Sequence, residues 1–397
     1  MKNVYLPAII LSVLMFFSCS QEKPFKKIVD DSLDFSLKQY GLMTDVMKSM
    51  PGQLPRTIDS EGKLITESSS WWTSGFYPGS LWYLYEYSND PGLKGNAVEM
   101  SMRVEKEKYT TDNHDVGFIL YCSFGNGLRL TGEESYNEIL MTGARSLCTR
   151  FRPVTGCIQS WEATDRWQCP VIVDNLMNLE LLMWAFRHSR DSSFYRIATS
   201  HADVTMKNHY RPDHSAYHVV SYDTVTGQVQ VKATAQGAAT ESVWARGQSW
   251  GLYGYTMMYR ETGLKRYLDH AVNIADFLIN HPNLPSDKIP YWDYLAPEIP
   301  NARRDASSAA IMASALIELG GIVGGEKGDQ YMKIAEIQIR SLSSPAYRAK
   351  LGENGNFILM HSVGSIPHNS EIDVPLTYAD YYFIEALLRY RKILKQS

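Results

Sequence analysis

The sequence predicts an all-α protein whose helices close into an (α/α)6 barrel of six αα-hairpins, with one small β-hairpin inserted. Three observations favour this fold. A turn–aromatic–helix signature recurs along the chain, about twelve helical segments can be counted, and apolar segments alternate with amphipathic ones. Alternating buried and amphipathic helices suit two concentric rings. The alternative is an open helical solenoid that serves as a protein-binding surface.

The composition of the 397-residue chain is that of a globular protein. Hydrophobic residues make 44% and aromatic residues 12%, which excludes a disordered chain, and five cysteines are too few for a disulfide scaffold. The 39 Lys and Arg against 43 Asp and Glu give a net charge of −4, so we expect no nucleic-acid partner. No linker of low complexity divides the chain, which predicts a single domain over residues 19–397 and leaves the oligomeric state open.

The N-terminal segment is typical of a bacterial lipoprotein signal, with an apolar run over residues 4–17 that ends at Ser18-Cys19 like a lipobox. We expect residues 1–18 to be removed and Cys19 to be lipidated; an ordinary cleaved signal is the alternative. No later stretch is expected to be long and apolar enough to span a membrane. The expected location is therefore the bacterial cell envelope, facing the periplasm, with the lipid anchor as the only membrane contact.

The repeating unit is marked by tyrosines that follow a turn and precede a helical run. They are Tyr136, Tyr195, Tyr267 and Tyr331, at spacings of 59, 72 and 64 residues. Each interval holds two helical patterns and a connecting loop, as an αα-hairpin repeat with irregular loops does.

The helices are predicted in order from apolar positions that recur every three to four residues. They span residues 27–49, 76–88, 93–106, 116–131, 134–150, 172–190, 193–209, 245–262, 264–281, 305–321, 326–343 and 376–393. The even-numbered segments are the more apolar, and the sixth, 172–190, is apolar on most faces and must be buried. Odd-numbered segments such as 193–209 carry charged residues on one face. The one β-hairpin is predicted over 217–231, with Thr226-Gly227 as its turn.

Unusual polar and aromatic clusters lie at the predicted starts of the more apolar helices. In an up-and-down barrel all inner helices run the same way, so their N-termini meet at one rim. The clusters begin at residues 71, 114, 173, 244, 303 and 375. We therefore expect them to converge on a single pocket.

The chemistry of that rim favours an acidic sugar. Several helix N-termini aimed at one place favour an anion, and Arg246 adds a full charge with a planar fork suited to carboxylate or sulfate. The tryptophans Trp72, Trp161, Trp244 and Trp250 offer flat apolar faces on which sugar rings stack. Asn, Gln, His and Asp side chains take the hydroxyls.

Asp174 is the candidate proton donor. It lies in a first helical turn among apolar residues, where burial raises the pKa of a carboxyl and the helix N-terminus lowers it. We expect desolvation to dominate, which leaves an acid able to donate a proton near neutrality. Asp115 and Asp305 have a helix N-cap as their simpler role, and for Asp305 we prefer the cap.

Other chemistries find little support in the sequence. It has no HExxH helix, CxxC pair, P-loop or G-x-S-x-G elbow, and the His114-Asp115 dipeptide stands without further metal-ligand spacing, so we expect no metal. An oxidising compartment allows Cys157 and Cys169 to pair, and buried free thiols are the alternative. Histidines on or beside the outer-helix patterns are expected to be solvated or capping. These are His188, His201, His209, His270 and His281.

Five motifs taken together resemble glycoside hydrolase family 88, the unsaturated glucuronyl hydrolases. They are Trp72-Thr73-Ser74-Gly75-Phe76, His114-Asp115-Val116-Gly117-Phe118, Val173-Asp174-Asn175-Leu176-Met177-Asn178, Arg246-Gly247-Gln248-Ser249-Trp250-Gly251 and Arg304-Asp305-Ala306-Ser307-Ser308. The resemblance covers nearly the whole chain after the signal, in order. It implies an (α/α)6 barrel and a glycosidase that removes 4,5-unsaturated glucuronic acid from the non-reducing end of lyase-generated oligosaccharides, glycosaminoglycan fragments above all.

The resemblance also implies hydration of the C4=C5 double bond rather than ordinary glycoside hydrolysis. Asp174 matches the general acid/base that protonates C4 and helps water add at C5, after which the hemiketal opens and the glycosidic link breaks. Asp115 matches the second essential carboxylate. The positions that match substrate contacts are His114, His218, Gln236 and Arg246, and those that match aromatic walls are Trp72, Trp161 and Trp250. No metal or organic cofactor is implied.

Substrate preference stays open at this stage. Some relatives that prefer sulfated glycosaminoglycans resemble one another in a Ser-x-x-Ser-x-Lys loop; here Ser362 and Ser365 are present and the lysine is absent. His361 or His368 is the candidate substitute, and an ordinary surface histidine is the alternative for both. Two other functions compete: a family 105 hydrolase acting on pectin fragments, and a non-catalytic glycan-binding lipoprotein. The binding protein would need the aromatic residues and Arg246 but would have no use for a proton donor.

Overall fold

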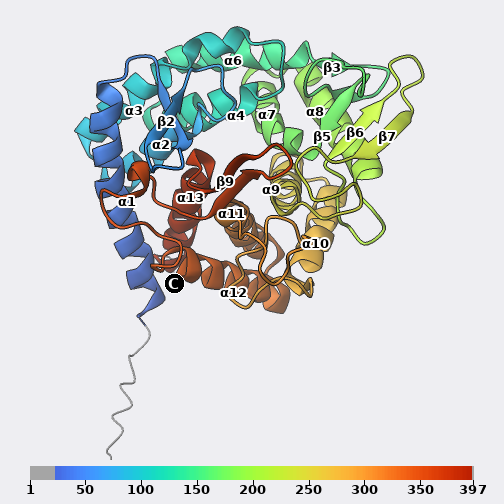
Figure 1. The fold of residues 1–397 in the computed structure, drawn as a ribbon. Helices are drawn as coiled ribbons and strands as arrows, with labels where there is room; N and C mark the ends of the chain where they lie inside the picture. The colour runs from blue at the N-terminus through green and yellow to red at the C-terminus, as the bar shows by residue number, and fades with distance from the viewer. Residues whose placement is uncertain (1–22, 396–397) are drawn as a thin grey trace, which may run out of the picture.

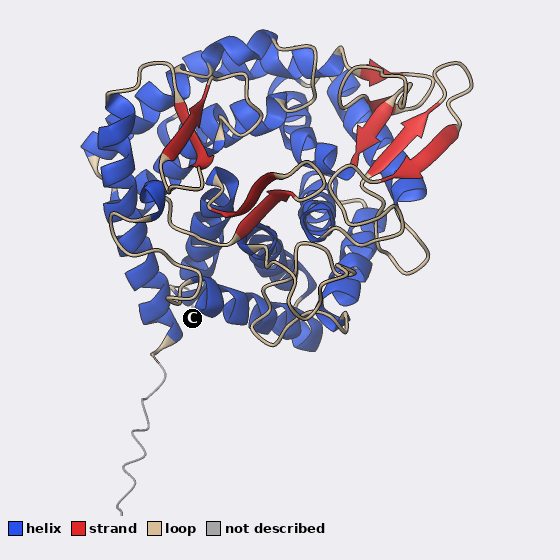
Figure 2. Ribbon diagram, viewed as in Figure 1, coloured by secondary structure: helices blue, strands red, loops and turns tan. Residues whose placement is uncertain are grey.

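The computed structural model describes residues 23–395, which form two concentric rings of helices (Figures 1 and 2). The outer ring consists of α1 (Phe25–Lys48), α3 (Pro91–Met102), α6 (Ser135–Cys148), α8 (Ser192–His209), α10 (Lys265–Asn280) and α12 (Gly325–Leu342). The inner ring consists of α2 (Phe76–Ser88), α4 (Val116–Leu120) with α5 (Asn126–Thr131), α7 (Leu179–Ser189), α9 (Ala245–Thr262), α11 (Ala306–Val323) and α13 (Thr377–Leu394). The predicted (α/α)6 barrel is confirmed.

The distribution of apolar residues decides which ring a helix joins. Inner helix α11 buries every residue from Ala306 to Ile317, so it is surrounded by other elements on all sides. Outer helix α10 buries a single stripe that includes Tyr267, Ala271 and Ile274, at the three- and four-residue spacing of an amphipathic helix. The stripe faces the inner ring, and the charged face is left to solvent.

All long connections lie at the end of the barrel where the inner helices begin. The chain passes from an outer to an inner helix through residues 49–75, 103–115, 149–172, 210–244, 281–305 and 343–376. The return from an inner to an outer helix takes only residues 89–90, 132–134, 190–191, 263–264 and 324. We call the first end the loop end and the second the turn end.

The tight turns stop each inner helix with a residue of positive φ. These residues are Asn89 (56°), Gly132 (67°), Arg190 (62°), Gly263 (68°) and Gly324 (63°). A left-handed residue at this position points its N–H back to a carbonyl of the last helical turn; the Gly263 N–H donates to the Tyr259 carbonyl at 2.8 Å. Asp90 and Asp191 then cap the following outer helices α3 and α8. The recurring turn signature in the sequence reflects these local caps.

The inner helices approach one another closely at the loop end because glycines stand at the contacts. A Cβ on Gly75 would lie 2.2 Å from the Ile119 carbonyl oxygen, and a Cβ on Gly117 would lie 2.5 Å from the Asn178 Cα. The Asn178 side-chain oxygen also accepts a hydrogen bond from the Phe118 N–H at 2.8 Å. The starts of three neighbouring inner segments are thereby locked together.

The expectation of a single β-hairpin is corrected. The predicted hairpin exists as β6 (Val219–Tyr222) and β7 (Val229–Ala233), but β5 (Pro170–Ile172) pairs with β6 to make a three-stranded antiparallel sheet. Residues 23–395 also contain three two-stranded pairs: β1 (Leu54–Ile58) with β2 (Leu64–Glu67), β3 (Phe151–Arg152) with β4 (Cys157–Ile158), and β8 (Ser362–Ser365) with β9 (Ser370–Val374). Such short strands lack a readable alternating pattern and depend on the contacts that the loop end provides.

Two inner segments are less regular than predicted. The segment 116–131 is interrupted by a π-helical turn over Tyr121–Gly125, between α4 and α5. The segment 172–190 begins as a 3₁₀ turn over Val173–Asn178 and becomes α-helical in α7. The chain leaves strand β5 with the Val173 N–H bonded to the His218 carbonyl at 3.2 Å, so it enters the helix through a tighter turn.

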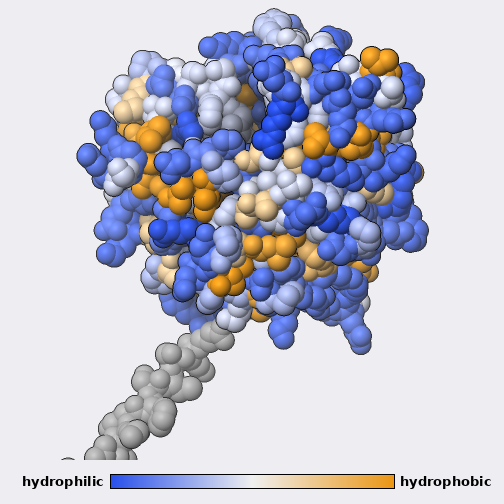
Figure 3. Space-filling view, turned by 45° about the vertical axis from the view of Figure 1, so that its right-hand side comes forward, coloured by the Kyte–Doolittle hydropathy of each residue, from blue (hydrophilic) through white to orange (hydrophobic). Residues whose placement is uncertain are grey.

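Helix α11 contradicts the expectation that no later stretch is apolar enough to span a membrane. Its 18 residues have a mean hydropathy of 1.6, but 78% of the helix is buried inside the barrel. Packing against α9, α12 and α13 covers its apolar surface. On the face shown in Figure 3, apolar residues form small separate patches among hydrophilic ones.

The buried histidines also differ from expectation. His201 and His209 are fully buried and His270 nearly so, whereas His188 is exposed. His201 Nδ1 accepts the Ile158 N–H at 3.0 Å, and His209 Nε2 donates to the Val171 carbonyl at 3.1 Å. These histidines therefore tie outer helix α8 to the strands of the loop end. Cys157 and Cys169 are free thiols in one buried apolar cluster.

The chain enters the barrel at the turn end. The Phe25 ring at the start of α1 packs edge-on against Tyr390 in the last turns of α13, with ring centroids 4.6 Å apart, and Asp30 pairs with Arg391 at 3.2 Å. Residues 1–22 lie outside the described residues. Removal of the signal, lipidation at Cys19 and the domain boundary therefore stay predictions.

Candidate active site

The predicted clusters converge at the loop end of the barrel. The Trp72 ring lies 5.0 Å from the Tyr378 ring, and Tyr378 lies 5.3 Å from the guanidinium of Arg246. His218 Nε2 lies 3.9 Å from Asp174 Oδ1. Side chains that precede or begin the inner helices α2, α9 and α13 thus meet those of His218, just before β6, and of the 3₁₀ turn. These residues are scattered over three hundred residues of sequence.

Asp174 lies in the 3₁₀ turn that follows strand β5, and its side chain is only 10% exposed. Its Oδ1 atom has no hydrogen-bond partner. Burial raises the pKa of Asp174 to about 7, while the positive charge of Arg246 opposes that rise. The carboxyl therefore holds a proton close to neutral pH, as the sequence predicted from its apolar neighbours.

Asp115 precedes α4 but does not cap it, because its side chain makes no hydrogen bond to the helix N-terminus. The carboxyl lies 3.4 Å from His114 Nε2 and is 18% exposed. Burial, and secondly the nearby charge of Asp174, raise the pKa of Asp115 to about 7. The two carboxyls thus repel each other when both are ionised, and the pair retains a proton near neutrality.

The tautomer of His218 is set by the chain around it. Its Nδ1 accepts the N–H groups of Ala235 and Gln236 at 3.1 and 3.2 Å, so the hydrogen of the neutral ring is on Nε2, which faces Asp174. Burial, with the charge of Arg246 adding to it, holds the pKa of His218 well below its usual value. The Trp244 ring lies 4.4 Å from the imidazole and supports it. His218 therefore presents a neutral N–H donor to the pocket.

Arg246 in the first turn of α9 is 2% exposed and held on several sides. Its Nη1 donates to the Val363 carbonyl, and its Nη2 donates to the Gly364 carbonyl at 2.8 Å and to Gln236 Oε1 at 2.5 Å. Only Nε lacks a partner. The planar fork is thus occupied by the chain itself, so Arg246 acts on the pocket chiefly through its charge.

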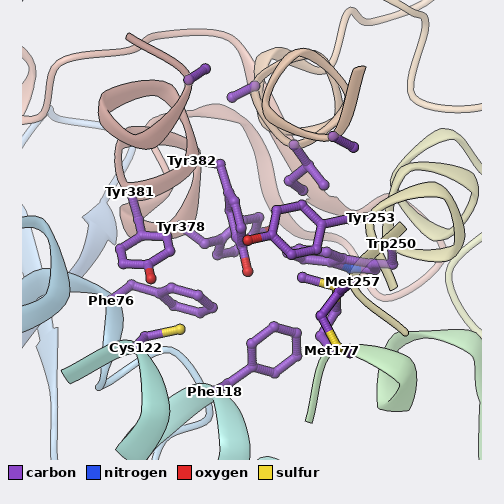
Figure 4. Close-up of a cluster of buried hydrophobic side chains, with 14 of the residues drawn as sticks. Phe76, Phe118, Cys122, Met177, Trp250, Tyr253, Met257, Tyr378, Tyr381 and Tyr382 are labelled. Atoms are coloured by element: carbon purple, nitrogen blue, oxygen red, sulfur yellow. The ribbon is translucent and has the colours of Figure 1, made fainter. Parts of the chain in front are cut away.

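The predicted aromatic walls divide into two kinds. Trp72 and Trp161 are half-buried, whereas Trp250 is fully buried. Trp250 packs against Phe118 with centroids 5.2 Å apart and belongs to the aromatic cluster that fills the barrel below the pocket (Figure 4). Trp161 packs on the separate cluster of Trp167, Ile172, Val219 and Ala233. Trp72 and Trp161 are therefore the tryptophans available for stacking, and Trp250 supports the floor.

His114 is buried, and burial lowers its pKa to about 3, so the ring is neutral. The main-chain N–H of His114 donates to the Ser160 carbonyl at 3.1 Å, which ties His114 to the loop that carries Trp161. Gln236 faces the pocket through its bond to Arg246. All the predicted substrate-contacting residues are thus tied to the loop end.

The sequence did not indicate that the β8–β9 hairpin closes over this site. In Figure 1 the hairpin crosses the centre of the barrel in front of the inner helices. It reaches Arg246 through the carbonyls of Val363 and Gly364, and main-chain carbonyls leave no signal in a sequence. Ser365 and His368 pair at 2.7 Å on this hairpin, and the charge of His368 is felt by His218. His361 instead pairs with Asp373, at 2.6 Å.

A cavity of about 800 Å³ opens at the other end of the barrel and includes none of the predicted site residues. Its charged groups neutralise one another: Arg389 pairs with Glu318 and Glu385, and Arg260 pairs with Glu318 and Glu180. Part of the aromatic cluster of Figure 4, including Phe118, Tyr253 and Tyr382, lines this cavity. The chemistry is therefore expected at the loop end.

Within residues 23–395, no group of three or more His, Cys, Asp and Glu side chains is arranged to hold a metal ion. The reactive groups of the pocket are instead two protonatable carboxyls, a neutral imidazole donor and a buried cation. This set can deliver a proton, take it back, and stabilise negative charge on a ligand.

The chain is similar over its whole length to curated enzymes. It is 40% identical over 99% of both chains to an unsaturated glucuronyl hydrolase of Formosa agariphila. It is 30% identical to an unsaturated chondroitin disaccharide hydrolase of Streptococcus pneumoniae, over 92% of this chain and 93% of the relative. No protein-family model matches the chain.

Solved structures give the same picture. An unsaturated glucuronyl hydrolase specific for heparin superposes with a TM-score of 0.90 and 46% identity, over 93% of this chain and 98% of the other. The unsaturated glucuronyl hydrolase of Bacillus sp. GL1, responsible for the degradation of glycosaminoglycan, gives a TM-score of 0.84 at 27% identity, over 92% and 97%. In both cases the likeness covers more than nine tenths of each chain.

Proposed function

Because this chain belongs to the unsaturated glucuronyl hydrolases of glycoside hydrolase family 88, we propose that its loop-end pocket removes unsaturated glucuronic acid from glycosaminoglycan fragments made by polysaccharide lyases. The chain is a glycosidase of that family. The observation that carries the assignment to this pocket is the pair of buried carboxyls, Asp174 and Asp115, whose pKa values are both raised to about 7. Heparin-derived fragments are our first choice of substrate, because a heparin-specific enzyme is 46% identical.

In this proposal Asp174 donates its proton to C4 of the unsaturated ring, and positive charge develops at C5 beside the ring oxygen. The resulting Asp174 carboxylate then takes a proton from the water that adds at C5. The hemiketal opens, and the glycosidic bond at C1 breaks. Arg246 stabilises the carboxylate form of Asp174 between these two steps, since its charge lowers the pKa of that group.

Asp115 and the histidines hold the substrate in this scheme. Asp115 lies beside Asp174, is partly exposed and has no capping duty, so its carboxylate is free to accept ring hydroxyls. His218 Nε2 donates a hydrogen bond from a ring that stays neutral. Trp72 and Trp161 stack on the sugar faces. The cation of Arg246 favours an anionic sugar by its field.

The catalytic proposal is preferred over a non-catalytic glycan-binding protein because Asp174 has no structural partner. A buried carboxyl whose Oδ1 accepts no hydrogen bond costs stability, and a binding protein gains nothing from it. The family 105 alternative is set aside because the similar enzymes are named for glucuronyl and chondroitin substrates.

The deciding experiment follows the loss of the alkene ultraviolet absorbance with unsaturated disaccharides from heparin, chondroitin, hyaluronan and rhamnogalacturonan. We expect loss with glycosaminoglycan disaccharides. Asp174→Asn should lower kcat by at least about a thousandfold, with disaccharide affinity kept, because the group that supplies the proton is gone while its shape remains. Asp380→Asn is the matched control, since Asp380 is also buried and burial also raises its pKa to about 7, but it bonds only structural groups. Turnover retained by Asp174→Asn removes Asp174 from the mechanism.

We further propose that the protein is lipid-anchored at Cys19 in the bacterial cell envelope. The barrel begins at its turn end, beside the C-terminus of α13, so a tether there leaves the loop-end pocket facing away from the membrane. Five residues, 20–24, separate Cys19 from Phe25 at the start of α1, and an extended tether of this length spans about 20 Å. Cys19→Ser should move the protein from the detergent phase to the aqueous phase of a cell extract. An unchanged partition argues against the anchor.

A further inference from the structure

Asp305 caps helix α11 with one carboxylate oxygen, Oδ1, and its other oxygen, Oδ2, faces Arg246. Its Oδ1 accepts the Ser307 N–H at 3.0 Å, the Ser307 hydroxyl at 2.6 Å and the Val363 N–H at 3.3 Å. The predicted N-cap role is therefore confirmed. Its Oδ2 has no hydrogen-bond partner and lies 3.7 Å from Arg246 Nη1.

Burial raises the pKa of Asp305, while the charge of Arg246 and the hydrogen bonds that Oδ1 accepts oppose the rise. The contacts of its two oxygens favour a carboxylate over a carboxylic acid. Every neighbour of Oδ1 is a donor, and the atom nearest to Oδ2 in an ion-pair contact is a guanidinium nitrogen of Arg246. A proton on Oδ2 would meet donors and find no acceptor. The side chain is 1% exposed, so water does not replace these contacts.

Asp305 and Arg246 hold the same residue of strand β8, Val363, through its two main-chain polar groups. The Val363 N–H donates to Asp305, and the Val363 carbonyl accepts from Arg246. Three segments remote in sequence, the starts of α9 and α11 and the hairpin over the pocket, are therefore joined through one ion pair. Helix capping by itself needs only Oδ1 and gives no reason for the second oxygen to face a buried cation.

We infer that Asp305 is a positioning residue for the reaction: it fixes the guanidinium of Arg246 under strand β8 and offsets the charge that this cation directs at Asp174. The inference rests on the proposed role of Asp174 as the proton donor. Asp305 does not itself touch the substrate, because it is covered by Val363 and Arg246.

The electrostatic consequence has a definite sign. The charged or titratable groups that face Asp174 are Asp115 ahead of α4, His218 just before β6 and Arg246 on α9; His218 is neutral, and His114 beside Asp115 is neutral too. Removing the negative charge of Asp305 leaves Arg246 less compensated, and this favours the ionised form of Asp174. Asp174 then loses its proton at a lower pH.

The test is Asp305→Asn, because the amide keeps an oxygen for the Ser307 and Val363 N–H groups and removes the charge. We expect the alkaline limb of the pH profile of kcat/KM to move down by roughly half to one pH unit, and activity at pH 7 to fall about two- to fivefold. Asp305→Ser, which also caps a helix, is the second variant in case the amide folds poorly. Circular dichroism and melting temperature establish that each variant is folded.

Asp380→Asn is the matched control. Asp380 is also a fully buried carboxylate in the first turn of an inner helix, where it accepts the N–H groups of Ile358 and Leu359 and the Tyr40 hydroxyl. It has no contact with Arg246, so its variant should lose stability without moving the pH limb. If the alkaline limb of kcat/KM lies at the same pH in Asp305→Asn and Asp305→Ser as in Asp380→Asn, Asp305 is only a cap and the inference is overturned.

A second measurement separates this inference from the proposed function. Carboxyl ¹³C titration of labelled Asp, with the Asp174→Asn spectrum to identify the Asp174 resonance, reports the pKa of that group without turnover. A lower value in Asp305→Asn supports the inference even if no tested disaccharide is cleaved. An unchanged value refutes it even if the wild type is an active hydrolase.

Discussion

At the scale of single residues, the site depends on keeping protons on carboxyls. Asp174 and Asp115 come from different inner segments and lie close enough for the charge of one to raise the pKa of the other. Burial contributes most of the rise in both cases. An isolated Asp in water has a pKa near 4, so at neutral pH it has already lost its proton and is a poor proton donor. The pocket thus converts two ordinary carboxyls into groups matched to proton transfer.

The pH dependence follows from this coupling. In the proposed mechanism activity requires protonated Asp174, so kcat/KM of the wild type should fall as the pH rises through about 7. Asp115→Asn removes a neighbouring negative charge and should lower the pKa of Asp174, which moves this fall to lower pH. The residual activity of the variant, measured from pH 4 to pH 9, shows the shift. A limb that stays in place contradicts the coupling of the two groups.

At the scale of elements, the two ends of the barrel have different roles: the turn end holds the helices together, and the loop end carries the proposed site. The turn end connects its helices by segments as short as Gly324 alone, and each turn has a left-handed residue. The loop end has long connections, short strand pairs and the proposed catalytic groups. Inner helices start at the loop end, so their N-termini and the loops define one pocket, while the opposite termini contribute only to the frame.

The left-handed turn positions allow a test in opposite directions. Gly263→Ala places a side chain at a φ of 68° with no atom within 4 Å to obstruct it, so the cost is conformational and about 1 kcal/mol. Arg190→Gly relieves the same strain at a φ of 62° and should raise the free energy of unfolding by a few tenths to 1 kcal/mol. Denaturant unfolding measures both. Equal signs for the two changes would show that turn geometry is not the cause.

At the scale of the whole molecule, buried neutral histidines make the barrel sensitive to acid. Burial lowers the pKa of His201 to about 3 and that of His209 to about 4. An unfolded chain binds protons at these rings below pH 6.5, while the folded protein does not until its lower pKa is reached. Their contribution to stability is therefore present above pH 6.5 and is lost as the pH falls through the window from 6.5 to about 4.

His201→Asn tests this dependence, because the amide oxygen can still accept the Ile158 N–H. Below pH 6 the slope of unfolding free energy against pH should become less steep by about 1.4 kcal/mol per pH unit, the value for one proton. Only the slope is compared, since the substitution also changes packing. His188→Asn, on an exposed helix end, is the control and should leave the slope unchanged. Parallel slopes for wild type and His201→Asn would falsify the assignment.

The sequence by itself determined the rings and the rim. Apolar residues around all faces of 306–317 require burial, a one-sided stripe in 265–280 requires an outer position, and left-handed turns at Gly132 and Gly263 fix where the helices reverse. These are local properties, governed by neighbours within a helical turn or two. Because all inner helices share a direction, even the gathering of Trp72, Asp174 and Arg246 at one end followed from the order of elements.

Only the tertiary structure decided how the groups at that end act on one another. The partner of Arg246 is a pair of main-chain carbonyls in β8, the tautomer of His218 is set by two N–H groups seventeen and eighteen residues away, and Asp305 faces a cation as well as its helix. The burial of Trp250 and His201 depends likewise on packing by distant segments. Charge, burial and hydrogen bonding between remote residues are functions of distance in space, and no local pattern in a chain encodes that distance.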